Sequence, residues 1–106
     1  MTRALVNVPA RAKKGDIIEI KTLISHPMES GYRVGYGGEP LKRDIIQTFS
    51  CDYDGAKVFL ARFSPAVAAN PFVSFHTVAT ASGKLVFRWE GDNGFEAEET
   101  AEIVVE

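Results

Sequence analysis

Residues 16–25 read Asp-Ile-Ile-Glu-Ile-Lys-Thr-Leu-Ile-Ser, and alternate side chains of this stretch fall on opposite faces. One face carries only β-branched side chains, those of Ile18, Ile20, Thr22 and Ile24. The other face carries the charges of Glu19 and Lys21. Alternation with a period of two, built from residues that favour a pleated backbone, predicts a β-strand with one buried face.

The same alternation recurs along the rest of the chain. Turn-forming residues such as Asp54-Gly55, Ala81-Ser82-Gly83 and Gly91-Asp92-Asn93-Gly94 separate the alternating stretches. The pattern predicts seven strands, over residues 4–8, 16–25, 44–53, 57–63, 72–80, 84–90 and 95–105. Short strands at this spacing favour an all-β fold, an immunoglobulin-like β-sandwich of about seven antiparallel strands, over a small barrel. Trp89 is the expected core anchor.

Length and composition limit what the chain can be. Its 106 residues suit one domain, residues 1–106, and 45% hydrophobic with 25% charged residues is typical of a globular protein. A net charge of −2 provides no basic excess for a nucleic-acid partner. The single cysteine excludes an intrachain disulfide and any site that needs several thiolates.

Few residues offer reactive chemistry. Cys51 alternates in phase with Phe49 and Tyr53, which predicts a packed core thiol, with an intermolecular disulfide as the alternative. His26, at the edge of a long loop, and His76, in a predicted strand, are expected to be surface or hydrogen-bonded side chains, because neither has neighbours at metal-ligand spacing.

The glycines and carboxylates also lack a site signature. Gly31, Gly35, Gly37 and Gly38 have neither phosphate-loop nor dinucleotide spacing. The carboxylates of the last strand predict a solvated strand face rather than a calcium site; they are Glu96, Glu98, Glu99 and Glu102. With no catalytic constellation, we expect no enzyme and no cofactor, but a binding or subunit module.

Four sequence blocks resemble the SoxZ family of sulfur-oxidation proteins. The first covers residues 14–31, from Lys-Gly-Asp-Ile-Ile-Glu-Ile to His-Pro-Met-Glu-Ser-Gly, and the third covers residues 68–75, Ala-Ala-Asn-Pro-Phe-Val-Ser-Phe; these two are the more specific. The others are residues 43–46 with Phe49, Cys51, Tyr53 and Gly55 after them, and residues 78–85. Together the blocks extend over most of the chain.

The resemblance implies an immunoglobulin-like sandwich that pairs with SoxY in the SoxYZ carrier of thiosulfate oxidation. In that family pair, SoxY carries sulfur intermediates on a cysteine of its glycine-rich C-terminal arm. This chain ends Ile-Val-Val-Glu, without such a cysteine. The implied role is a non-catalytic subunit that binds and stabilises SoxY and helps dock the other Sox enzymes. The alternative is a free-standing module that binds protein or sugar.

The segment from His26 to Arg43 interrupts the strand rhythm and is the best candidate site, since long ordered connections often bind partners. It is expected to hold a short hairpin with Gly37-Gly38 at its turn. Candidate partner-binding residues are His26, Met28, Glu29, Tyr32, Arg33, Tyr36 and Arg43. Ordinary loop packing is the alternative role for these side chains.

The expected location depends on the partner. No apolar window of about 18 residues predicts a membrane span, and the start of the chain lacks the apolar stretch of a secretory signal. Alone, this predicts a cytoplasmic protein. The resemblance implies instead that the chain reaches the periplasm by co-export with a signal-bearing SoxY. The sequence leaves self-association of the isolated chain open.

Overall fold

The computed structural model describes residues 4–106, so Met1, Thr2 and Arg3 of the expected N-terminal region lie outside the described residues. The described chain is nearly all β, which confirms the predicted class. Its strands are β1 (Ala4–Asn7), β2 (Arg11–Ala12), β3 (Ile17–Ile24), β4 (Ile46–Tyr53), β5 (Ala56–Arg62), β6 (Phe72–Val78), β7 (Gly83–Gly91) and β8 (Glu96–Val105). A single 3₁₀ turn, η1 (Asp92–Gly94), joins β7 to β8. Within residues 4–106, no helix has the length and apolar character needed to cross a membrane.

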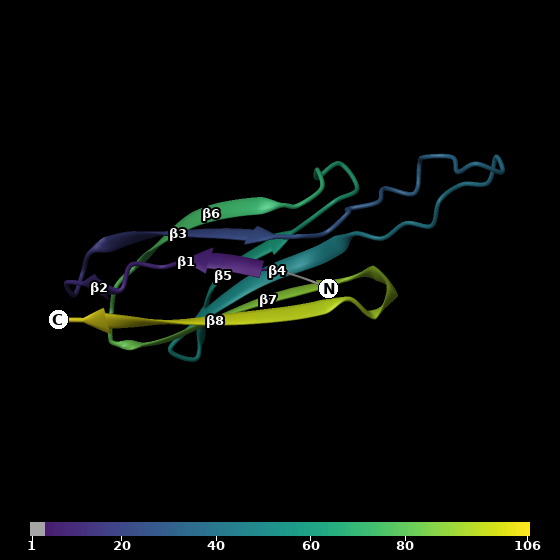
Figure 1. The fold of residues 1–106 in the computed structure, drawn as a ribbon. Helices are drawn as coiled ribbons and strands as arrows, with labels where there is room; N and C mark the ends of the chain where they lie inside the picture. Colours follow the sequence, from purple (N-terminus) through teal and green to yellow (C-terminus); the bar gives the residue numbers. More distant parts are fainter. Residues whose placement is uncertain (1–3) are drawn as a thin grey trace.

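The strands form two sheets, as expected for an immunoglobulin-like sandwich (Figure 1). One sheet has the order β1-β3-β6 and the other β2-β8-β7-β4-β5. Every pairing is antiparallel except that of β2 with β8, which is parallel. β2 was not among the predicted strands, because two residues are too short to show alternation. It carries the chain from the first sheet to the second just after Pro9.

The core lies between the sheets and has an aromatic centre. Trp89 is almost completely buried, which confirms it as an anchor, and its ring centroid lies 5.0 Å from that of Phe49. Phe59 of β5 stacks on Phe75 of β6 at 4.3 Å and so joins the two sheets. Thr22, the one polar residue on the buried face of β3, donates its hydroxyl to the Val73 carbonyl at 3.0 Å.

A bulge in β4 changes which side chains face the core. Its register with β7 shifts between Ile46 and Thr48, so Ile45 and Ile46 are both buried and Gln47 faces solvent. Unbroken alternation through Phe49 and Cys51 would place Gln47 on the buried face, and the bulge is the reason that it is not there. The opposing strand comes close at this point, where a Cβ on Gly91 would lie 2.4 Å from the Ile45 carbonyl oxygen. Only glycine leaves room for this approach.

Residues 29–44 form a hairpin, which we call the arm. Its base is closed by two backbone hydrogen bonds between Glu29 and Asp44, of 2.7 and 2.8 Å. Val34 pairs with Pro40 farther out, and Gly38 has a φ of +80° at the turn. These pairings confirm the expected hairpin. The arm projects from the end of the sandwich where β3 finishes (Figure 1), and the molecule measures 59 Å along its longest axis against 20 and 19 Å across it.

Candidate partner-binding site

Arg43 fixes the arm to the turn between β7 and β8. Its guanidinium donates two hydrogen bonds to Asp92, from Nε to Oδ2 at 2.8 Å and from Nη2 to Oδ1 at 3.0 Å. The same carboxylate accepts hydrogen bonds from the Gln47 amide and from the Ile45 backbone. The Arg43 hydrogen bonds are the largest cause that lowers the pKa of Asp92. Arg43 therefore acts first as a strut of the arm, with about half of its side chain exposed.

Glu29 and Arg33 pair within the arm. Arg33 Nε donates to both carboxylate oxygens of Glu29, at 3.0 and 3.3 Å. This hydrogen bonding lowers the pKa of Glu29, and the carboxylate is largely covered. Arg33 remains 73% exposed, so its guanidinium is presented outward in a fixed position.

His26 lies in the interior, so of the two roles expected for it, surface or hydrogen-bonded, the structure shows the second. It is only 4% exposed, and its ring meets Phe95 edge to face at 4.7 Å. Nδ1 accepts the Met28 backbone N–H at 2.9 Å, while Nε2 lies 3.7 Å from Asp44. Burial lowers the pKa of His26, partly opposed by the charges of Asp44 and Asp92. The imidazole supports the base of the arm and does not offer a contact surface.

Met28 is also buried, at 6% exposure, so it cannot line a docking surface as expected. Its backbone adopts the left-handed conformation, with φ of 48°, and this turn directs the thioether into the core. Met28 Sδ accepts the Ile46 N–H at 3.2 Å. This burial was not predictable from the sequence, because the residue pattern of a loop does not indicate a positive φ at a non-glycine residue.

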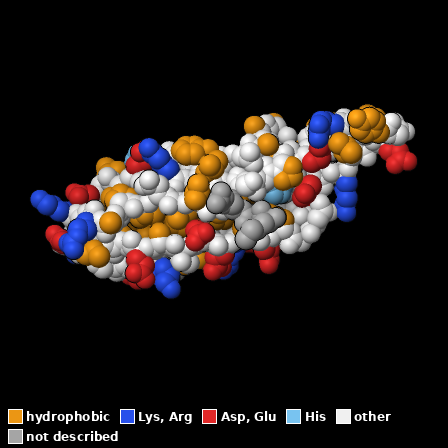
Figure 2. Space-filling view, in the orientation of Figure 1, with side chains coloured by type: hydrophobic (Ala, Val, Ile, Leu, Met, Phe, Trp, Pro, Cys, Tyr) orange, Lys and Arg blue, Asp and Glu red, His pale blue; other side chains and the backbone are white. Residues whose placement is uncertain are grey.

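The free part of the arm is apolar and aromatic. Tyr32 is 82% exposed, Val34 64%, and Tyr36 fully exposed. Hydrophobic side chains gather at the far end of the arm in the space-filling view (Figure 2). Of the predicted contact residues, the structure leaves Tyr32, Arg33 and Tyr36 available together and adds Val34, which the sequence analysis missed. Exposed aromatic and arginine side chains are the usual anchors of protein interfaces.

A second exposed apolar region covers the outer side of the β1-β3-β6 sheet, and we call it the banded face. Apolar side chains occupy both of its ends, with Leu5, Leu23 and Phe72 at one end and Ile17 and Val78 at the other. A polar band of Asn7, Glu19, Lys21, Ser74 and His76 separates them. A shallow hollow of about 300 Å³ lies at the first end. This exposed apolar surface could have been predicted from the sequence, because Ile17 and Leu23 lie on the same side of the strand as the charged Glu19 and Lys21.

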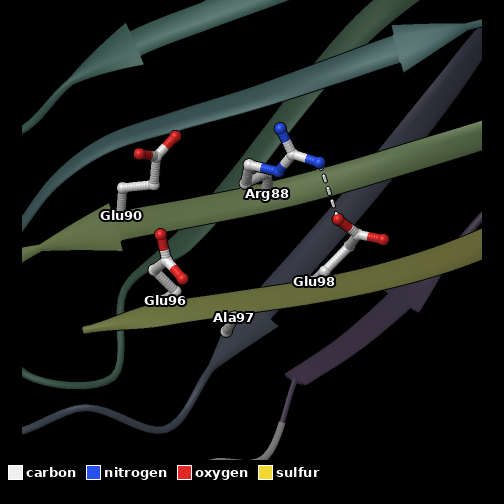
Figure 3. Close-up of a pocket in the computed structure, with 5 residues that line it drawn as sticks. All are labelled: Arg88, Glu90, Glu96, Ala97 and Glu98. Carbon is white, nitrogen blue, oxygen red and sulfur yellow. Dashed lines mark hydrogen bonds and ion pairs between the residues drawn. The ribbon is translucent and has the colours of Figure 1, made fainter. Parts of the chain in front are cut away.

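The outer side of the β8-β7-β4 region is charged instead, and we call it the charged face. A shallow pocket of about 400 Å³ there is lined by Arg88, Glu90, Glu96, Ala97 and Glu98 (Figure 3). Arg88 pairs with Glu98 at 2.8 Å, and both are half exposed. Glu90 and Glu96 lie opposite each other on neighbouring strands. Within residues 4–106, no group of three or more His, Cys, Asp or Glu side chains converges as metal ligands would.

The single thiol is shielded. Cys51 is completely buried, which confirms the predicted core position. Burial, with a smaller contribution from Asp52, raises its pKa to about 12.

The second histidine, His76, lies on the banded face, 3.7 Å from Glu19. The described chain is therefore a small β-sandwich with a projecting arm and two chemically different outer faces.

The chain belongs to the SoxZ family, since the family model described as "Sulphur oxidation protein SoxZ" matches residues 6–102. No curated protein matches it. Among solved structures, a superoxide reductase (neelaredoxin) from Ignicoccus hospitalis is 19% identical, with a TM-score of 0.76 over 99% of this chain and 82% of that chain.

Two further solved structures share the fold. A putative superoxide reductase from Thermotoga maritima is 17% identical, with a TM-score of 0.72 over 97% of this chain and 85% of that chain. The sulfur carrier protein SoxY from Chlorobium limicola f thiosulfatophilum is 15% identical, with a TM-score of 0.67 over 97% of this chain and 78% of that chain. At these identities the likeness concerns the fold alone, and it is the family match that supports a role in a Sox system.

Proposed function

We propose that this chain is the non-catalytic subunit of a SoxYZ sulfur carrier, and that it binds and stabilises a SoxY protein. The observation that carries the proposal is the SoxZ family match over residues 6–102. The exposed side chains of the arm support it, because Tyr32, Val34 and Tyr36 offer an apolar surface of the kind that partners cover.

The division of labour follows from the chemistry of the chain. Its only thiol is buried and protonated, so the sulfur-bearing cysteine is assigned to SoxY. This chain contributes a docking surface through which the complex transiently meets the other Sox enzymes. We further propose a periplasmic location, reached by export together with a signal-bearing SoxY.

Co-purification tests the assignment. A tagged SoxY protein expressed with this chain is expected to retain it in a one-to-one complex. The double variant Arg33→Ala/Tyr36→Ala is expected to weaken that complex about tenfold or more, because it removes an arginine and an aromatic anchor. Leu60→Ala, a comparable truncation of an exposed apolar residue on β5, is the matched control and should bind normally.

Two results would contradict the proposal. A wild-type chain that stays monomeric and ignores SoxY would favour the free-standing binding module instead. Full activity of the Arg33→Ala/Tyr36→Ala complex in a reconstituted thiosulfate-oxidation assay would show that the arm is not part of the docking surface. Melting temperatures of the variants establish that each domain is folded.

A further inference from the structure

The banded face has apolar side chains at both ends of β3 and two opposite charges between them. Along β3 the outward residues are Ile17, Glu19, Lys21 and Leu23, that is, apolar, acidic, basic and apolar. β6 extends the apolar ends, because Val78 lies beside Ile17 and Phe72 beside Leu23. All of these side chains point to solvent.

The exposed apolar side chains are concentrated on this face. Of the ten large hydrophobic residues that are exposed in residues 4–106, five lie here and three lie on the arm. Apolar side chains gathered at two ends of one exposed sheet face, with polar residues between them, are typical of a surface that another protein covers. Leu5 enlarges the area at the end where β1 pairs with β3.

We propose that the banded face binds a second copy of this chain in a two-fold dimer, sheet against sheet. The two-fold axis runs between the facing β1-β3-β6 sheets of the two copies and is perpendicular to their strands. It passes over β3 at the level of Ile20. Rotation about it brings Ile17 opposite Leu23 of the second copy and Glu19 opposite Lys21, and each contact occurs twice. On β6 the same operation brings Val78 opposite Phe72.

Charge complementarity selects this arrangement over its alternatives. With the axis along the strands, each residue faces its own copy, so that Glu19 opposes Glu19 and Lys21 opposes Lys21, which is repulsive. The charged face is a poor candidate for self-pairing, because Glu90, Glu96 and Glu98 would bring further carboxylates together. In the proposed dimer both apolar ends are covered and both charges of β3 find opposite partners.

This inference goes beyond the proposed function, and its test needs only the full chain. Sedimentation equilibrium over a range of concentrations is expected to show a reversible dimer of the wild type. Lys21→Glu places carboxylates opposite one another at two symmetric points and is expected to raise the dissociation constant about tenfold or more. The double variant Glu19→Lys/Lys21→Glu reverses both charges and is expected to restore dimerisation.

Lys84→Glu is the matched control, because it makes the same charge reversal on an exposed strand position of the other sheet. It should dimerise like the wild type. Ile17→Ser removes apolar contact without a charge change and should also weaken the dimer, which keeps the test decisive if Lys21→Glu misfolds.

Several outcomes overturn the proposal. These are a wild type that is monomeric at millimolar concentration, failure of the charge-swapped double variant to recover, and equal effects of Lys84→Glu and Lys21→Glu. A banded face that binds only SoxY, with no dimer of this chain, also overturns it. Normal SoxY capture in that case leaves the proposed function standing, so the two failures are distinguishable.

Discussion

The banded face and the charged face are the two outer sides of one sandwich, and they differ in the half of each strand that the core does not use. On β3 and β6 the outward side chains are apolar at both ends of the strand and polar in the middle. On β7 and β8 they are mostly charged, with Arg88, Glu90, Glu96 and Glu98 in one cluster (Figure 3). Inward positions are mostly apolar on both sheets, with the hydrogen-bonded Thr22 as a buried polar exception, because both sheets cover the same core. The composition of the outward positions therefore reports contacts outside the domain.

The largest expected difference is between the same substitution, Phe to Ala, made in the core and on the banded face. Phe49→Ala removes a ring that packs on Phe87 and Trp89 and is expected to lower the free energy of unfolding by about 3–5 kcal/mol. Phe72→Ala, on the banded face, is expected to cost less than about 1 kcal/mol. Urea titration measures both. Equal losses would mean that Phe72 is part of the core and that the banded face is misassigned.

A smaller difference is expected between two ion pairs. Asp92→Ala removes the acceptor of Arg43, Gln47 and the Ile45 backbone, and is expected to cost about 1–3 kcal/mol. Glu98→Ala breaks the exposed pair with Arg88 on the charged face and is expected to cost less than about 1 kcal/mol. Faster amide hydrogen exchange at Glu29 and Asp44 should accompany only the first change. If both variants behave alike, Asp92 does not anchor the arm.

The smallest expected effect is the pH dependence of the free energy of unfolding that arises from His26. Because the folded-state pKa of His26 lies below its ordinary value of 6.5, the unfolded chain takes up the proton first as the pH falls. The stability contributed by its neutral imidazole is fully present above pH 6.5 and is lost as the pH falls toward the lowered pKa. His26→Gln should flatten this dependence in urea titrations. A slope that is unchanged in His26→Gln would contradict a buried neutral His26.

The sequence was sufficient for the fold wherever alternation was unbroken. The buried faces of β3 and β8 followed from residues such as Ile20 and Ile103. Prediction failed where geometry departs from the period of two. The β4 bulge turned Gln47 outward, and the left-handed backbone of Met28 drew a loop side chain into the core.

The candidate site was predicted in part. The arm and its exposed Tyr32, Arg33 and Tyr36 were expected from a long segment that did not alternate. The burial of His26 was not, because its partners, Asn70 and Phe95, are remote in sequence and are brought to it only by the packing of the two sheets. Local sequence patterns carry little information about such contacts.

The buried Cys51 has a consequence for selectivity. With its pKa raised to about 12 by burial, the Cys51 thiol is protonated at neutral pH. In an assembly that handles activated sulfur, a second reactive thiol would compete as an acceptor and divert the cargo. In the proposed carrier, the buried and protonated Cys51 is not such a competitor, which would leave the partner's cysteine as the one thiol that accepts the sulfur.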